Sequence, residues 1–133
     1  MVMEKNQMKT DFELNKKMLS AVIPAYNEEA AIVETIQRCK KALESINGLD
    51  FEIIVVDDGS TDKTGYLAQE NGAKVIHNPH NIGYGRAIKR GIAEAQGDII
   101  FISDADGTYP LEDIPKFLQK YEEGYDMVVG QRT

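Results

Sequence analysis

The chain has 133 residues, enough for one domain with a single buried core. Its formal net charge of −7 and its lack of any Lys or Arg cluster argue against nucleic-acid binding, which needs basic side chains gathered on one face. A single cysteine excludes an intramolecular disulfide, and no apolar run approaches the roughly eighteen residues of a membrane span, so we expect a cytoplasmic chain without signal peptide or membrane span.

The N-terminal segment is polar, and we expect residues 1–17 to form a leader outside the domain, either a tail or a short helix. The domain itself is expected to cover 18–133. A first buried strand is predicted over Leu19–Ile23, and Pro24 closes it. The residues after Pro24 form a turn that leads into the first helix.

Apolar residues then recur at steps of three and four over residues 33–46, which predicts a helix with one apolar face that ends before Gly48. Cys39 lies on this face and is expected to be a small core residue. Glu28 and Glu29 fall in the expected first turn, where acidic side chains suit the helix dipole. For Glu28 this structural role is the alternative to a role in a binding site.

A continuous β-branched run predicts a second, central strand over Phe51–Val56. Asp57 and Asp58 follow this strand directly. The next helix is predicted over 62–70, and either Asp62 or Ser60 is able to cap it. Two adjacent acids cannot both cap one helix, so Asp57 and Asp58 indicate a site at the end of the strand.

A third strand is predicted over Ala73–Ile76 and a third helix over 84–96. The two histidines in the loop between them have no third ligand nearby, so a zinc site is not expected. Gly83 and Gly85 open the helix in the manner of a phosphate-binding turn. Without a third glycine, and after the third strand, they do not indicate a dinucleotide-binding fold.

The most informative stretch begins with the apolar run Ile99–Ile102, which predicts a fully buried strand. Asp104 and Asp106 follow it, so they are expected just beyond the carboxyl end of a strand, where open parallel sheets bind ligands. Paired carboxylates suit a hard cation such as Mg²⁺ or Mn²⁺, whose remaining ligands are often substrate phosphates. The alternative is a solvated acidic turn.

A last helix is predicted over 111–123 and a last strand over 126–129. Strands and helices thus alternate along the whole chain, which predicts an α/β fold with a mainly parallel sheet and helices on both faces. The sequence stops directly after a strand, where a ligand crevice would lack one wall. We therefore expect a truncated domain.

Four motifs follow one another along the chain: Val22–Glu29, Ile54–Asp62, Asn81–Ala87 with Gly91, and Asp104–Asp106. In this order they resemble the family 2 glycosyltransferases, and most closely the branch of dolichyl-phosphate mannose synthases and bacterial polyprenyl-phosphate sugar transferases. The resemblance implies a three-layer GT-A fold and inverting, metal-dependent transfer of a sugar from a nucleotide-diphosphate donor. Residues 18–133 would be its nucleotide-sugar-binding part.

The resemblance also implies the residues of the site. The donor, a UDP- or GDP-sugar, would be bound by Pro24, Ala25, Tyr26, Glu28, Val56, Asp58, Asp104, Ala105, Asp106 and Arg132. Asp104 and Asp106 would hold Mg²⁺ or Mn²⁺, and Asp106 would act in catalysis through the metal. Thr108 stands where many members of this branch carry a Gln ligand, and a hydroxyl is a poorer ligand than an amide carbonyl.

The acceptor implied by the resemblance is a polyprenyl phosphate or a saccharide. A lipid phosphate is already an anion and needs no general base, whereas a saccharide hydroxyl needs a carboxylate that the family supplies from beyond this segment. The sequence therefore names no general base. With a lipid acceptor, the intact protein is expected at the cytosolic face of a membrane, and a homo-oligomer is compatible with the sequence.

Two other functions fit parts of the sequence. The chain could bind a nucleotide sugar without transferring it, because the acceptor-binding segments of the family are missing. Phe101–Thr108 also resembles the opening motif of haloacid-dehalogenase-type phosphatases, with Asp104 as the nucleophile and Asp106 as the general acid. Only residues 109–133 follow that motif, too few to complete a phosphatase site.

Overall fold

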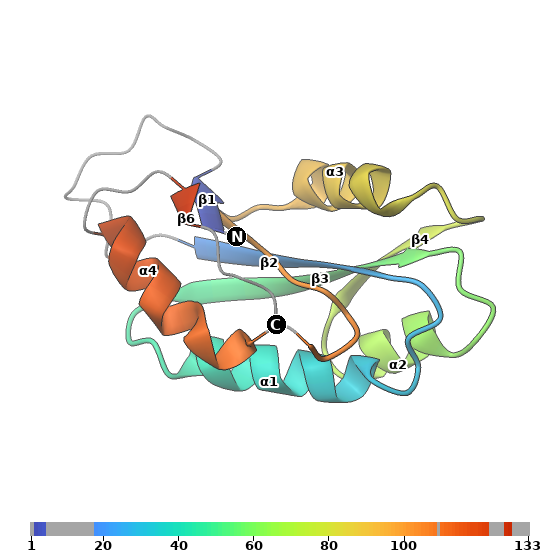
Figure 1. The fold of residues 1–133 in the computed structure, drawn as a ribbon, viewed down its shortest axis with the longest axis horizontal. Coiled ribbons are helices and arrows are strands. Elements are labelled where there is room, and N and C mark those ends of the chain that lie inside the picture. Colours follow the sequence, from blue (N-terminus) through green and yellow to red (C-terminus); the bar gives the residue numbers. More distant parts are fainter. Residues whose placement is uncertain (1, 5–17, 109, 123–126, 129–133) are drawn as a thin grey trace.

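We describe residues 2–4, 18–108, 110–122 and 127–128 of the chain in a computed structural model. A central sheet is flanked by helices on its two faces (Figure 1). The strands are β1 Val2–Glu4, β2 Met18–Ala25, β3 Asp50–Asp58, β4 Lys74–Asn78, β5 Ile99–Ile102 and β6 Met127–Val128. The helices are α1 Ile32–Glu44, α2 Thr64–Glu70, α3 Tyr84–Glu94 and α4 Ile114–Glu122, with a 3-10 turn over Leu111–Asp113 before α4.

The strand order in the sheet is β4-β3-β2-β5-β1-β6. Strands β4, β3, β2 and β5 are parallel, whereas β1 runs antiparallel to both of its neighbours, β5 and β6. The parallel strands come from the continuous apolar runs in the sequence, as expected for strands that are covered on both faces. The predicted α/β fold with a mainly parallel sheet is therefore confirmed.

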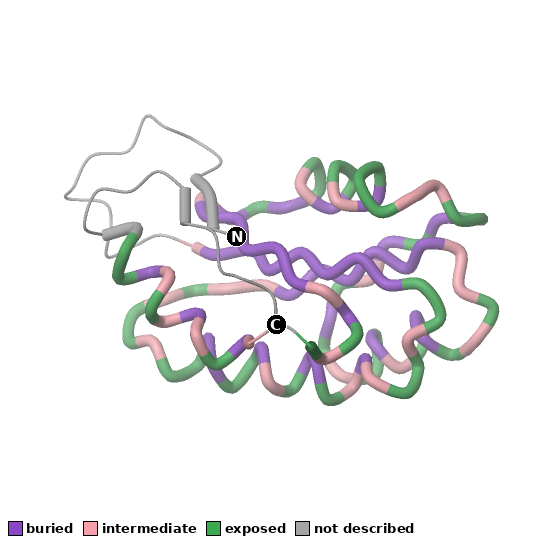
Figure 2. The backbone as a smooth tube through the Cα atoms, in the orientation of Figure 1, coloured by how far each residue is buried: buried purple, intermediate pink, exposed green. Residues whose placement is uncertain are grey.

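Helices α1, α2 and α4 cover one face of the sheet and α3 covers the other (Figure 1). A hydrophobic core lies on each face of the sheet. Successive residues of each strand point to opposite faces, so each parallel strand contributes side chains to both cores. In β3, Ile53 and Val55 pack under α1 and α2, while Ile54 and Val56 pack under α3. The central strands are accordingly buried along almost their whole length (Figure 2).

Helix α1 buries Ile36, Cys39 and Leu43 of the predicted apolar face together with Ile32 just before it, whereas Val33 and Ile46 are only partly buried. Burial raises the pKa of the Cys39 thiol to about 12, so the thiol stays protonated at neutral pH. The prediction that Cys39 is a small core residue is confirmed. Among the described helices, none combines the length and the apolar character needed to cross a bilayer.

Two predicted boundaries near the carboxyl edge of the sheet are wrong. Helix α1 begins at Ile32, so Glu28 and Glu29 lie in the turn before it and not in its first turn. Strand β3 continues to Asp58, because Asp57 and Asp58 still pair with the end of β4. The two acids are thus the last residues of the strand. The helix predicted over 111–123 also begins differently, because residues 111–113 form a 3-10 turn and α4 starts only at Ile114. The remaining predicted elements differ from the observed ones by at most two residues at their ends.

The ends of the chain also depart from the prediction. Val2–Glu4, expected in a tail or a short leader helix, form β1 and pair with β5. The last predicted strand is present as β6, but it pairs antiparallel with β1 and does not extend the parallel sheet. Residues 5–17, Asp126 and Val129 lie outside the described part of the chain.

Helix α3 lies very close to the sheet at Gly91. A Cβ atom on Gly91 would lie 2.5 Å from Cγ1 of Val22 and 3.0 Å from Cγ2 of Val56. Only a residue without a side chain fits this contact. The close approach lets α3 pack directly against β2 and β3.

We expect Gly91→Ala to lower the free energy of unfolding by up to about 2 kcal/mol, because overpacking costs about 1–3 kcal/mol and better helix propensity offsets about 1 kcal/mol. Gly85→Ala in the same helix is the matched control, since nothing lies within 4 Å of its added Cβ. It should raise the unfolding free energy by up to about 1 kcal/mol. Urea titration of both variants measures the effect, and changes of the same sign would contradict the close contact.

Candidate functional site

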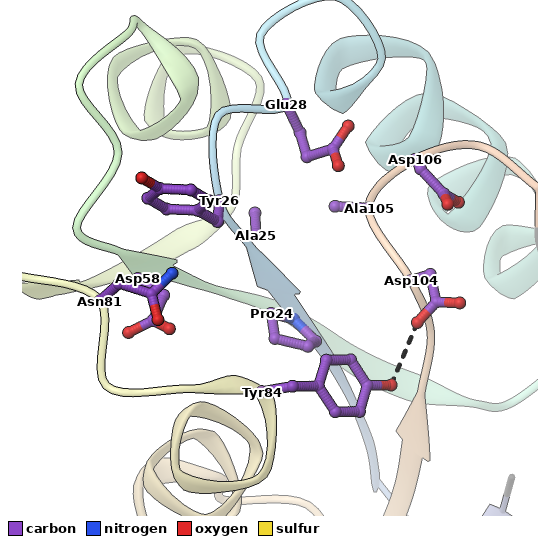
Figure 3. Close-up of a pocket in the computed structure, with 10 residues that line it drawn as sticks. All are labelled: Pro24, Ala25, Tyr26, Glu28, Asp58, Asn81, Tyr84, Asp104, Ala105 and Asp106. Carbon is purple, nitrogen blue, oxygen red and sulfur yellow. Dashed lines mark hydrogen bonds between the residues drawn. The ribbon is translucent and has the colours of Figure 1, made fainter.

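A cleft of about 430 Å³ lies at the carboxyl ends of the parallel strands, the edge where open α/β sheets bind ligands. Figure 3 shows the side chains around it. The cleft is lined by Pro24, Ala25, Tyr26, Glu28, Asp58, Asn81, Tyr84, Asp104, Ala105 and Asp106. Residues that are far apart in the sequence thus meet because their strands end at the same edge.

All the predicted site residues line this cleft except Val56 and Arg132. The side chain of Val56 is fully buried in the core under α3, so the structure does not bring it to the cleft. Arg132 lies outside the described residues. Asn81 and Tyr84 line the cleft but were not predicted as site residues, although both belong to the Asn81–Ala87 motif.

Four carboxylates line the cleft, and three of them come from two loops beyond the strand ends (Figure 3). Glu28 comes from the turn after β2, and Asp104 and Asp106 come from the acidic loop, which we define as residues Ser103–Thr108. Burial raises the pKa of Glu28, and the negative charges of Asp106, Asp62 and Asp104 raise this pKa further. The cleft therefore has a negative potential that favours a cation.

Hydroxyl groups orient both aspartates of the acidic loop. The Tyr84 hydroxyl donates to Oδ1 of Asp104 at 3.0 Å. The Thr108 hydroxyl and amide donate to Oδ1 of Asp106 at 2.6 and 3.0 Å. Thr108 is thus a hydrogen-bond donor to Asp106. The sequence analysis considered Thr108 only at the position of a Gln metal ligand and did not predict this role.

Asp58 ties the end of β3 to the loop that precedes α3. It is 4% exposed and accepts hydrogen bonds from the Asn78 amide at 2.8 Å and from the backbone N–H groups of Ile82 and Gly83 at 3.0 and 3.1 Å. This loop carries Asn81 and leads to Tyr84. Asp58 therefore lines the cleft and also fixes the segment that supplies another part of its wall.

Asp57 likewise fixes the loop that follows β3. Its Oδ1 accepts a hydrogen bond from the Ser60 N–H at 3.1 Å, and its Oδ2 lies 3.3 Å from Nδ1 of His77. Gly65 of α2 packs directly against this pair, and a Cβ there would lie 2.4 Å from Oδ2 of Asp57. Neither Asp57 nor His77 lines the cleft in the described structure.

Asn27 fixes the turn that carries Tyr26 and Glu28 into the cleft. Its backbone has a φ of +51°, a left-handed conformation that Asn tolerates better than most residues. The Asn27 N–H donates to Oγ of Ser60 at 2.9 Å, and Oδ1 of Asn27 accepts from the Thr61 N–H at 2.8 Å. Residues 28 and 29 make further hydrogen bonds to residues 62–64. The turn is therefore fixed to the segment that follows β3.

The turn gives a stability prediction. Asn27→Gly should lower the free energy of unfolding by about 1 kcal/mol, since it loses side-chain hydrogen bonds but keeps the left-handed backbone. Asn27→Ala should cost about 1 kcal/mol more, because a Cβ without the Asn side chain's local hydrogen bonds disfavours a positive φ. Urea titration compares the two variants. An equal loss in both would show that the backbone conformation contributes nothing.

Residues 20–133 match the family model described as Glycosyl transferase family 2. The chain belongs to this family. The family resemblance found in the sequence is thus confirmed, and the match does not fit the phosphatase alternative.

Similar proteins agree with this assignment. Dolichol-phosphate mannosyltransferase of Pyrococcus furiosus is 40% identical over 118 residues, which are 86% of this chain and 33% of that protein. The structure of glucosyl-3-phosphoglycerate synthase of Mycobacterium tuberculosis, in complex with Mn²⁺, UDP and glucosyl-3-phosphoglycerate, matches with a TM-score of 0.69 at 32% identity. The match covers 90% of this chain and 46% of the synthase chain. Mannosyl-3-phosphoglycerate synthase of Rubrobacter xylanophilus has a TM-score of 0.61 at 29% identity and covers 68% and 31%.

These structural neighbours are glycosyltransferases of the GT-A fold, so the predicted fold is confirmed. The chain spans about a third of the length of the mannosyltransferase and less than half of the glucosyl-3-phosphoglycerate synthase. All the residues that line the cleft fall within residues 20–133, which match the family model.

Proposed function

We propose that the cleft binds a nucleotide-diphosphate sugar together with Mg²⁺ or Mn²⁺, as the donor site of an inverting glycosyltransferase. One observation carries this proposal. Asp104 and Asp106 line the same cleft as Glu28 and Tyr26, at the carboxyl edge of a parallel sheet in a family 2 domain. The cleft thus combines acidic oxygen ligands with an aromatic wall.

The residues present fit a divalent cation. Asp104 and Asp106 offer carboxylate oxygens, the ligands that Mg²⁺ and Mn²⁺ prefer. Within the described residues, no group of three His, Cys, Asp or Glu side chains forms a complete metal site. A cation held by the two aspartates would therefore take its other ligands from the donor diphosphate and water. The Mn²⁺ in the complex of the mycobacterial synthase supports this assignment.

The opposite part of the cleft suits the nucleoside. Tyr26 is 46% exposed at the rim, where its ring offers an apolar face to a base or ribose. Pro24 and Asp58 lie beside it, and a carboxylate in this position is able to accept a hydrogen bond from a uracil or guanine N–H. UDP in the mycobacterial complex makes the uridine nucleotide the first candidate.

The proposed function gives these groups separate roles during transfer. When bound, the metal would act as a Lewis acid that neutralises charge on the departing nucleoside diphosphate. Asp104 and Asp106 would hold it, and the Tyr84 and Thr108 hydroxyls would orient their carboxylates. The acceptor would attack the anomeric carbon from the face opposite the nucleotide, so that the bond to the donor phosphate breaks with inversion.

The proposed acceptor is a polyprenyl phosphate, for which the similarity to a dolichol-phosphate mannosyltransferase is the support. Its phosphate is already anionic and needs no general base, and the cytosolic face of a membrane would then be the site of action. The alternative acceptor is a saccharide. A second candidate function is donor binding without transfer, because the chain spans only part of its relatives.

An acceptor-dependent assay separates these two functions. Release of free nucleotide from UDP-glucose or GDP-mannose is followed with and without a polyprenyl phosphate. Release that rises with the acceptor indicates transfer. Donor binding without acceptor-stimulated release indicates a binding module.

Calorimetric titration tests the donor site itself. We expect UDP or GDP to bind more tightly with Mn²⁺ than without it, and Asp106→Asn to weaken the Mn²⁺-dependent binding at least about tenfold, since even outer-shell partners of a metal site are worth 10- to 100-fold. Asp113→Asn is the matched control, an aspartate nearby in the chain that does not line the cleft. Equal binding by wild type and Asp106→Asn would contradict the proposed metal site.

A further inference from the structure

Helix α1 contacts the backbone of the acidic loop through two side chains that lie one turn apart. The hydroxyl of Thr35, which is fully buried, donates to the carbonyl oxygen of Ala105 at 3.1 Å. The Nη1 group of Arg38 donates to the carbonyl oxygen of Gly107 at 2.9 Å. Ala105 and Gly107 flank Asp106, so the two contacts fix the backbone on both sides of this aspartate.

Arg38 is itself held in place. Its Nε and Nη2 groups donate to the two carboxylate oxygens of Glu112 at 2.7 and 2.8 Å, a bidentate pair in the 3-10 turn that follows the acidic loop. The side chain of Arg38 is 25% exposed. The hydrogen bonds from Arg38 lower the pKa of Glu112 to about 2, so the pair stays charged at neutral pH.

The same guanidinium group thus joins three segments of the chain. Arg38 belongs to α1, and its guanidinium donates hydrogen bonds to a backbone carbonyl of the acidic loop and to Glu112 in the turn before α4. A lysine would offer a single ammonium group without the planar fork that makes these contacts together. Helix α1 is a rigid support because Ile36 and Cys39, next to the two polar residues, are buried in the core.

Thr35 and Arg38 do not line the cleft in the described structure. Their effect on a ligand would therefore pass through the backbone of the acidic loop. Two ligands of one metal ion must be held in a fixed relation, and outer-shell contacts commonly provide this support. Gly107, whose carbonyl accepts from Arg38, has a left-handed backbone with a φ of +82°.

We propose that Thr35 and Arg38 are positioning residues that hold the acidic loop, so that Asp104 and Asp106 present their carboxylates together to a metal-bound diphosphate. The inference rests on the proposed function, since it needs a metal-dependent donor site. It adds to that function a support on α1 that lies outside the cleft.

The test uses four variants of the full chain and one control. Arg38→Met removes the guanidinium but keeps an unbranched apolar stem, and Arg38→Lys keeps the charge. Thr35→Val removes the hydroxyl at nearly constant volume, and Thr35→Ser restores it. Lys116→Met is the control, because Lys116 pairs with Asp113 at 3.8 Å in the neighbouring helix and has no contact with the acidic loop among its described interactions.

The first readout is hydrogen exchange at the amides of the acidic loop, measured without ligand. We expect Arg38→Met and Thr35→Val to speed exchange of these amides by about tenfold, the effect of losing one well-formed hydrogen bond. Arg38→Lys and Thr35→Ser should fall between these variants and wild type. The control should match wild type. Unchanged exchange in a folded Arg38→Met variant would overturn the proposal.

The second readout is the ratio of the UDP dissociation constants measured without and with Mn²⁺. A lower folded fraction would raise both dissociation constants by the same factor and leave their ratio unchanged. A displaced acidic loop should raise only the constant measured with Mn²⁺, by about tenfold or more. Because Thr35 is fully buried, Thr35→Val could fail to fold, and the two Arg38 variants then decide the outcome.

If wild type shows no Mn²⁺-dependent binding, the proposed function fails and this inference fails with it. If wild type shows it and the variants keep the same ratio, only this inference is overturned.

Discussion

The structure depends on the way it places several carboxylates at one edge of the sheet. Like charges in a partly buried site repel one another, and burial adds to the cost of keeping them ionised. The fold offsets this cost by directing donors at the acids. Asp57 and Asp58 receive backbone N–H groups, and Asp104 and Asp106 receive hydroxyl groups. These hydrogen bonds therefore hold the acidic side chains of the carboxyl edge in a defined arrangement.

The acids at this edge fall into two groups with different tasks. Asp57 and Asp58, at the end of β3, are buried and hold the loops that follow β3 and β4. Asp104 and Asp106 are more exposed and face the cleft. The first pair fixes the surrounding loops, although Asp58 also lines the cleft, and the second pair is the one proposed to hold the metal.

The sequence predicted those features that depend on local pattern. The apolar run before Asp104 specified β5 with its observed ends, and the alternation of strands and helices specified the parallel sheet. Features that depend on distant pairing were missed. Three residues cannot indicate a strand by themselves, and β1 exists because it pairs with β5, far along the chain. The contacts of Tyr84 and Arg38 with the acidic loop, 20 and 69 residues away in the sequence, are likewise set by the fold and leave no local pattern.

The most direct test of the account is a crystal structure of the chain grown with UDP and Mn²⁺, with the metal located by its anomalous scattering. The account predicts a manganese peak in the cleft against the carboxylates of Asp104 and Asp106, with the diphosphate beside it and the base near Tyr26. Manganese bound instead at Asp57 and Asp58, or UDP ordered outside the cleft, would contradict the proposed donor site.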